Sequence, residues 1–424
     1  MKNVWKQWLS RILTVVWLLM VLIVPVSAEE KEPEVDDLHA ASAVVMEAKT
    51  GRILFEKNGS EERAMASTTK IMTLLVALEY GDFETPVTVS ANAARQPKVR
   101  MDLKEGETFR LMDLLYAMML VSYNDAAVAI AEAVAGDVPS FCYLMNMKAR
   151  ELGAYRTHFA TPNGLDAEDH YSTAVDMALI GRAALEDDTA LQIMQTRSYT
   201  ISKDEVNCRS VSLVNKNPML SSYTEAIGGK TGFTSEAGLC LVSMAERGGV
   251  QLIAVVLGSG WPPHSNYRVA DSLKLFEYGF NEFQFESIQT DWLDEHPVVE
   301  VSGSFVDRVS TRLEGRTGSQ TPMGSNMPTG SSPNLMYYMK ESDSVSLFYD
   351  LPYVVEAPVT EGQVLGQAAV CIDGKAVGYL DVVAQESAEE KTFWRLLWNV
   401  CKSIWPSVDV GLAENVKSGS QQAL

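Results

Sequence analysis

The chain has 424 residues and a formal net charge of −20 at neutral pH, with 46% hydrophobic residues. This length is sufficient for two domains. A protein this acidic is a poor candidate for binding nucleic acid or another polyanion through its general surface, because the charges would repel each other.

The first 28 residues have the pattern of a signal peptide. Three positive charges (Lys2, Lys6 and Arg11) precede an apolar run over residues 12–26, and small residues follow directly. The alternative is an uncleaved membrane anchor, but the run is short for a span of about 20 residues. We therefore expect export and cleavage after Ala28. The leader carries three positive and no negative charges, so the mature chain would have a net charge of −23.

Residues 29–285 are expected to form one α+β domain. Two short strands joined by a turn are predicted within residues 40–58, and helical patterns dominate from about 67 to 200. Two apolar strand-like runs lie on either side of Gly248 and Gly249, and a helix that packs back on them is predicted next. Strands at both ends with helices between them predict a sheet that collects distant parts of the chain.

The pattern changes after residue 285. Short alternating stretches separated by Gly, Pro and Asp predict a small all-β domain over residues 286–387. Within it, residues 314–334 are rich in Gly, Ser, Thr and Pro, which is typical of a flexible loop. Residues 388–406 are predicted to form an amphipathic helix with an aromatic-rich apolar face and basic flanks. Residues 407–424 are predicted to be a disordered tail. Such a face suits a membrane interface, and docking on the β domain is the alternative.

Neither the cysteines nor the histidines show the spacing of a metal site. The five cysteines are odd in number and lack a CxxC pair, which also argues against a disulfide framework. The histidines include no HExxH or other helical pair, and His158 and His170 are interpreted as structural. We expect no metal and no cofactor.

The first candidate for chemistry is the pair Ser67 and Lys70 in the segment MASTTKIMTLLVALEYG. At a spacing of three the two side chains lie on the same side of a helix. A serine hydroxyl is a weak nucleophile until a base takes its proton, and lysine is such a base only when it is neutral. Burial and nearby positive charge both lower a lysine pKa, so an apolar surround would suit this role.

Two further motifs follow in order along the chain. Ser122 and Asn124 form an S-x-N motif directly before a helical run, and Lys230, Thr231 and Gly232 form a K-T-G motif directly before an apolar strand. Each motif alone is easily a surface or capping feature. Ordered S-x-x-K, S-x-N and K-T-G together are the set found in penicillin-recognising serine enzymes.

With these motifs and the blocks DLLYAMMLVSYNDAAVAIAEAVAG, FATPNGLDAEDHYSTAVDMA and EAIGGKTGFTSEAGLCLV, the chain resembles the D-alanyl-D-alanine carboxypeptidases. These are the low-molecular-mass penicillin-binding proteins. The resemblance implies a penicillin-binding-protein/β-lactamase-like catalytic domain, in which an antiparallel sheet carries a helical subdomain. A small all-β domain and an amphipathic C-terminal helix follow in that family, so the likeness covers nearly the whole mature chain.

The resemblance also implies a role for each site residue. Ser67 is the nucleophile that attacks the carbonyl between two terminal D-alanines, and Lys70 is its base. Ser122 relays a proton to the departing D-alanine with Lys230 nearby, and Asn124 binds the substrate amide. The implied substrate-binding residues are Lys230, Thr231, Gly232, Phe233 and Arg268, with the backbone N–H groups of Ser67 and Phe233 as the oxyanion hole. Lys230 and Arg268 are both expected to help keep Lys70 neutral.

The implied substrate is a peptidoglycan peptide that ends in D-Ala-D-Ala, and β-lactams would act as covalent inhibitors. The enzyme would work at the outer face of the cytoplasmic membrane or in the cell wall, held at the membrane surface by the C-terminal helix. The physiological stage and the oligomeric state do not follow from the sequence.

Three alternatives remain open. A D,D-transpeptidase or endopeptidase has the same motifs and differs in the acceptor or the bond cleaved. A class A-like β-lactamase needs a glutamate that activates water, and neither Asp166 nor Glu168 aligns with that role. A non-catalytic wall-binding scaffold is disfavoured because Ser67, Lys70, Ser122 and Lys230 are all present.

Overall fold

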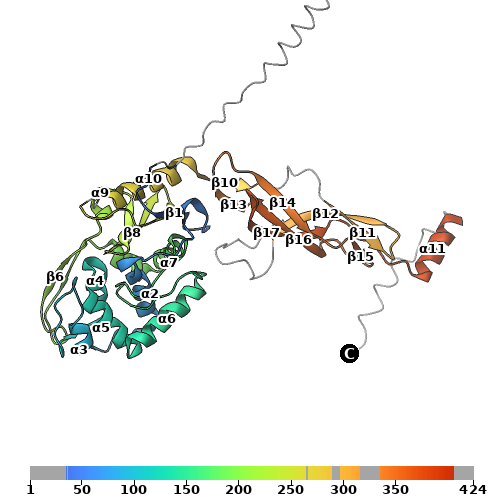
Figure 1. Ribbon diagram of the computed structural model, residues 1–424. Helices are drawn as coiled ribbons and strands as arrows, with labels where there is room; N and C mark the ends of the chain where they lie inside the picture. The colour runs from blue at the N-terminus through green and yellow to red at the C-terminus, as the bar shows by residue number, and fades with distance from the viewer. Residues whose placement is uncertain (1–34, 36, 264–265, 289–296, 316–334, 405–424) are drawn as a thin grey trace, which may run out of the picture. The chain divides into compact units, whose positions relative to one another are not determined.

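The structure is a computed structural model that describes residues 35, 37–263, 266–288, 297–315 and 335–404 (Figure 1). The predicted signal peptide and the predicted tail lie outside the described residues.

A five-stranded antiparallel sheet forms the base of the first domain. In spatial order its strands are β2 (Ile53–Lys57), β1 (Ser42–Glu47), β9 (Val250–Leu257), β8 (Gly238–Arg247) and β7 (Ala226–Thr234). The strands come from both ends of the domain, because β1 pairs with β9 across some 200 residues of sequence. The predicted sheet of distant strands is therefore confirmed.

Helices α7 (Ala174–Glu186) and α10 (Tyr267–Glu282) pack on opposite faces of this sheet. Gly181 of α7 faces Ile253, whereas Gly279 of α10 faces Leu252. Neighbouring residues of a strand point to opposite faces, so these two contacts place the helices on the two sides. The helix predicted to pack back on the strands is α10.

The other helices of the first domain lie between β2 and β7 in the sequence, and their buried side chains are largely apolar. They are the short turn η1 (Ala66–Thr69), α2 (Lys70–Tyr80), α3 (Ala91–Ala94), α4 (Leu111–Val121), α5 (Asn124–Ala135), α6 (Val138–Glu151), α8 (Asp188–Gln195) and α9 (Met219–Ser222). Two small two-stranded sheets accompany them, β3 (Val87–Thr88) with β4 (Thr108–Phe109) and β5 (Ser198–Ile201) with β6 (Val211–Val214). The buried side chains of α2, α4 and α5 share one core with the sheet.

The second region is a β domain with a six-stranded sheet. Its spatial order is β14 (Val345–Asp350), β16 (Val364–Ile372), β17 (Lys375–Ala384), β12 (Arg308–Gly315), β11 (Val298–Ser302) and β15 (Val354–Glu356). Only β11 and β15 run parallel among these neighbours. Two apolar clusters form its core.

The edges of this domain differ from the predicted boundaries. Strand β10 (Gln284–Ile288) crosses the predicted boundary at residue 285 and pairs with β13 (Leu335–Met339). Glu314 and Gly315 are the end of β12, because their pairing with β17 continues to that point. They were predicted as the start of a flexible loop, and the rest of that loop, residues 316–334, lies outside the described residues.

The C-terminal helix α11 spans Phe393–Ile404 and so begins five residues after the predicted start. Ala388 is fully buried and forms a bridge with Val359, which makes it part of the β domain. Positions 405 and 406 of the predicted helix lie outside the described residues.

Within the described ranges, no single helix has the length and apolar composition to cross a bilayer, although the bent pair α5 and α6 meets both criteria jointly.

Candidate active site

The site lies where the beginning of α2 meets strand β7. Gly232 of β7 is packed so closely against η1 that a Cβ atom there would lie 2.9 Å from the Met65 carbonyl oxygen and 3.0 Å from the Ser67 nitrogen. Any other residue at this position would push the strand away from the turn. The absent side chain therefore lets the K-T-G and S-x-x-K motifs meet.

Ser67 and Lys70 face each other at hydrogen-bonding distance. Lys70 is fully buried, and its Nζ lies 2.9 Å from Ser67 Oγ and 2.9 Å from Asn124 Oδ1. Nζ also donates to the carbonyl oxygen of Asn163. The oxygens of Asn124 and Asn163 only accept hydrogen bonds. A neutral amine therefore uses both N–H groups on these carbonyls and directs its lone pair at the Ser67 hydroxyl.

Burial is the main reason that the pKa of Lys70 lies well below its ordinary value. The positive charge of Lys230 lowers it further, and the carboxylate of Asp125 opposes both effects. The expectation that Arg268 also acts on Lys70 is not met. Arg268 instead acts on Lys230, whose pKa falls to about 7 through burial and, to a lesser degree, through the guanidinium.

Ser122 ends helix α4 in a left-handed conformation with φ of 70°. A residue with a side chain is strained there, and such strain is typical of functional positions. Its Oγ is buried and has no hydrogen-bond partner among the described residues. Buried hydroxyl groups are rarely left without a partner, so this group is available to a substrate.

Asn124 and Asp125 attach the preceding loop to the site. The Asn124 backbone N–H donates to the Val99 carbonyl at 2.7 Å, and the buried Asp125 carboxylate accepts from the N–H groups of Met101 and Leu103 at 2.9 and 3.0 Å. Asn124 Oδ1 holds Lys70, in addition to the expected role of its side chain in binding the substrate.

The cationic residues lie on the other side of the site. Lys230 is buried and donates from Nζ to the Thr231 carbonyl at 2.9 Å, while Arg268 donates to the Gly232 carbonyl at 3.2 Å. Arg268 Nε is buried and without a partner in the described part of the chain. Thr231 is half-buried and Phe233 is exposed on the same strand. The predicted site residues thus come from four places in the fold: η1 with the start of α2, the junction of α4 and α5, strand β7, and helix α10.

Sequence reasoning considered the loop over residues 161–169 only for its carboxylates, and it did not identify the backbone carbonyls of this loop as part of the site. Its Asn163 carbonyl accepts from Lys70, and Thr73 donates to the Pro162 carbonyl at 2.6 Å. Gly164 has φ of +79°, and a Cβ there would lie 2.1 Å from the Ala66 carbonyl oxygen. The Asn-Gly pair was a visible turn signal, but backbone carbonyls leave no trace of their partners in a sequence.

Two carboxylates considered for water activation are placed elsewhere. Asp166 accepts a hydrogen bond from Thr234 at 2.8 Å, and Glu168 is exposed on the loop surface. Neither is hydrogen-bonded to Ser67 or Lys70 in the structure.

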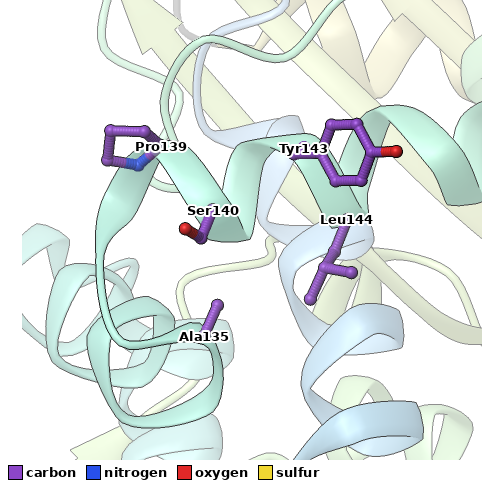
Figure 2. A pocket seen from close by; sticks show the side chains of 5 residues that line it. All are labelled: Ala135, Pro139, Ser140, Tyr143 and Leu144. Atoms are coloured by element: carbon purple, nitrogen blue, oxygen red, sulfur yellow. The ribbon is translucent and has the colours of Figure 1, made fainter.

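A separate hollow lies at the corner between α5 and α6 (Figure 2). It is lined by Ala135, Pro139, Ser140, Tyr143 and Leu144, and none of the predicted site residues belongs to it. Among the residues that the structure describes, no three His, Cys, Asp or Glu side chains are grouped as metal ligands.

The chain is similar to known proteins over most of its length. The sequence profile of the D-alanyl-D-alanine carboxypeptidase family matches residues 28–260. The D-alanyl-D-alanine carboxypeptidase DacF of Bacillus subtilis is 31% identical over 361 residues, which cover 84% of this chain and 87% of the relative. DacC of Escherichia coli is 32% identical over 389 residues, covering 88% and 90%.

Solved structures extend the similarity to the β domain. Penicillin binding protein 5 from Haemophilus influenzae superposes with a TM-score of 0.62 at 28% identity, covering 84% of this chain and 98% of that chain. The carboxypeptidase DacD from Francisella tularensis gives 0.64 at 26% identity, covering 85% and 96%. The predicted fold class is confirmed.

Proposed function

This chain belongs to the D-alanyl-D-alanine carboxypeptidase family and is a serine peptidase of that family, and we propose that Ser67 and Lys70 carry out its reaction. The substrate is a peptidoglycan stem peptide ending in D-Ala-D-Ala. The observation that carries the proposal is the arrangement of Lys70, whose Nζ lies 2.9 Å from Ser67 Oγ while two carbonyl oxygens accept its remaining hydrogens.

In the acylation step, Ser67 Oγ attacks the carbonyl carbon of the penultimate D-alanine and Lys70 takes the hydroxyl proton. The negative charge that develops on the carbonyl oxygen is stabilised by the N–H groups of Ser67 and Phe233. The C–N bond then breaks, and the departing D-alanine amine receives a proton through Ser122. Water hydrolyses the resulting ester and restores Ser67.

The substrate's terminal carboxylate is bound by the groups on and beside β7. Arg268 supplies positive charge in an otherwise acidic protein, Lys230 adds to it when protonated, and Arg268 Nε has no partner among the described residues. Thr231 supplies a hydroxyl on the same strand. A free carboxylate positioned here places the last peptide bond over Ser67 in one register.

The proposal is tested with a Ser67→Ala variant and a matched Ser60→Ala control, since Ser60 is exposed and its hydroxyl donates to Glu56, which is not a site residue. D-alanine release from a synthetic pentapeptide and labelling by a fluorescent penicillin are measured for both. We expect Ser67→Ala to lose both signals and Ser60→Ala to keep them. D-alanine release by Ser67→Ala at the wild-type rate would show that the nucleophile is another residue.

The same assays distinguish the alternative functions. A transpeptidase needs an acceptor amine for rapid D-alanine release, whereas a carboxypeptidase needs only water, and a scaffold releases none. Asp166 is bonded to Thr234 and Glu168 is exposed, so neither supports the rapid deacylation of a β-lactamase. We therefore expect a long-lived penicilloyl-enzyme, and hydrolysis of a chromogenic cephalosporin at hundreds of turnovers per second would contradict this.

We also propose export through the predicted signal peptide and binding of α11 to the outer face of the membrane. Seven apolar side chains of α11 are exposed, among them Trp394 at 75% and Ile404 at 70%. Their exposure supports an apolar face without a partner in the described chain, and an aromatic-rich face of this kind favours the bilayer interface.

The truncation that tests the anchor should begin at Phe393. Removing residues from 388 onward would also remove buried Ala388 and the backbone bond from Lys391 to Gly303. We expect the chain lacking 393–424 to become soluble and to keep its activity on a soluble pentapeptide. Retention in the membrane fraction would place the anchor elsewhere, for example in an uncleaved leader.

A further inference from the structure

Two neighbouring threonines beside the nucleophile make the same local bond but have different surroundings. The hydroxyl of Thr68 donates to the Met65 carbonyl at 2.7 Å, and that of Thr69 donates to the Ala66 carbonyl at 2.8 Å. Both side chains are fully buried. Only Thr69 also contacts a histidine, because its Oγ1 lies 3.0 Å from His170 Nε2.

The contacts of His170 determine which of its nitrogens carries hydrogen. The backbone N–H of Ala160 donates to Nδ1 at 3.0 Å, so Nδ1 is unprotonated. Thr69 uses its own hydrogen on the Ala66 carbonyl, which can only accept, so Nε2–H donates to Thr69 Oγ1. Burial lowers the pKa of His170 to about 4, in agreement with a neutral ring at neutral pH.

The Ala66 carbonyl is the end of this chain of hydrogen bonds. Ala66 is 1% exposed and has φ of 49°, a conformation that is unfavourable for a residue with a side chain. Gly164 is packed against its oxygen. The carbonyl belongs to the same planar peptide group as the N–H of Ser67. A hydrogen bond accepted by this oxygen therefore affects how strongly the N–H donates.

We propose that Thr69 and His170 are positioning residues that hold and polarise the Ala66–Ser67 peptide group, so that the Ser67 N–H becomes a stronger donor to the oxyanion. The inference rests on the proposed function in one respect, namely that Ser67 N–H contributes to the oxyanion hole. His170 was interpreted from the sequence as structural, and this proposal gives it a part in the reaction without contact with the substrate.

The physical basis is the cooperativity of hydrogen bonds in series. A hydrogen bond to a carbonyl oxygen draws electron density from the amide nitrogen and strengthens the N–H as a donor, by about 10–30% per bond. The hole acts on charge that develops in the transition state. Removal of the chain should therefore lower kcat and leave KM nearly unchanged. We expect about a tenfold loss, smaller than the roughly hundredfold or greater loss on deleting an oxyanion-hole donor.

The test compares Thr69→Val with Thr68→Val, since each removes one buried hydroxyl from the same turn with little change of shape. Thermal unfolding, D-alanine release and acylation by a fluorescent penicillin are measured. We expect Thr69→Val to lose about tenfold in kcat with KM within twofold, Thr69→Ser to recover most of this loss, and Thr68→Val to stay within twofold of wild type.

Two further readouts report on the oxyanion hole itself. Affinity for an arylboronic acid, which forms a tetrahedral anion on serine, should fall by the same factor as kcat in Thr69→Val. The infrared carbonyl band of the penicilloyl-enzyme should move to higher wavenumber, because a weaker hole polarises the ester less. A purely structural role for Thr69 would move neither measurement.

His170→Phe interrupts the same chain of hydrogen bonds at the histidine. It tests the inference by itself if Thr69→Val does not fold. It should reduce kcat by a smaller factor than Thr69→Val, and it should cause no further loss when added to Thr69→Val, because both act through one chain. Equal losses in Thr68→Val and Thr69→Val, or wild-type boronate affinity in both Thr69→Val and His170→Phe, would overturn the inference. Neither result bears on the Ser67→Ala test, so failure of this inference is distinct from failure of the proposed function.

Discussion

Charged side chains are usually exposed and large apolar side chains are usually buried, and helices α2 and α11 each break one half of this rule. Helix α2 begins with Lys70, which is completely buried, whereas α11 exposes Trp394, Leu397 and other large apolar side chains. A buried lysine disfavours its own charged form, and an exposed apolar face forgoes about 25 cal/mol for each Å² that it fails to bury. Neither arrangement serves the stability of the isolated chain.

The two helices differ in what compensates for the unfavourable arrangement. For Lys70 the compensation lies within the chain, where the oxygens of Asn124 and Asn163 accept its hydrogens and the surroundings stabilise the neutral amine. For α11 the described residues contain no covering surface, and under our proposal the membrane outside the chain covers this face. The burial of Lys70 is thus explained by catalysis, whereas the exposed apolar face of α11 is explained by the proposed membrane surface. Four measurements test these explanations and the site around Lys70.

The largest effect is expected for Lys70→Met. Methionine occupies a similar volume and has no amine, so D-alanine release and penicillin acylation should fall at least about a thousandfold, as for loss of a catalytic base and its proton transfers. Methionine leaves the buried oxygens of Asn124 and Asn163 without this donor, which costs about 1–3 kcal/mol for each, while the cost of burying the amine is removed, so the melting temperature should fall only modestly. A large drop in melting temperature would show that Lys70 has a structural role.

Arg268→Ala should have the next largest effect and should act mainly on KM. Carboxylate binding is similar in the ground and transition states, so we expect KM for a pentapeptide to rise about 10–100-fold with a smaller change in kcat. Michaelis–Menten analysis of D-alanine release tests this. A fall in kcat with unchanged KM would show instead that Arg268 stabilises the transition state.

The double substitution Trp394→Ser and Leu397→Ser should weaken binding to anionic lipid vesicles by at least about tenfold, because it removes two large apolar side chains from the interfacial face. Co-sedimentation measures this. Phe348→Ser is a matched control, since Phe348 is 61% exposed but lies on β14 of the β domain. Equal losses in the two variants would indicate that α11 has no special membrane role.

The last expected effect concerns stability at acid pH and not activity or binding. The pKa of His170 is lowered from 6.5 to about 4 in the folded state. Its neutral form therefore contributes stability that is complete above about pH 6.5 and is lost as the pH falls toward 4, by up to roughly 3 kcal/mol. Denaturant unfolding between these pH values should show a shallower dependence in His170→Phe than in wild type. Parallel pH profiles would show that His170 is not the titrating group.

Prediction from sequence succeeded where the information is local and periodic. The strands within residues 40–58, the two strands on either side of Gly248 and the helix after them follow from apolar periodicity and turn residues. It was less successful at edges. Strand β10 runs across the predicted boundary at residue 285, and Ala388 pairs with Val359, because pairing with distant segments leaves no periodic signal in the sequence.

By itself, the sequence determined the order of the S-x-x-K, S-x-N and K-T-G motifs, the α+β and all-β parts, and the apolar face of α11, since each depends on residue type and local spacing. Tertiary structure alone decided that η1 packs where a Cβ atom at position 232 would lie, that Asn163 accepts from Lys70 through its backbone, and that His170 reaches Thr69. These contacts join residues far apart in the chain through close approach and backbone groups. Every residue type has the same backbone carbonyl, so its partner becomes known only when the chain has folded.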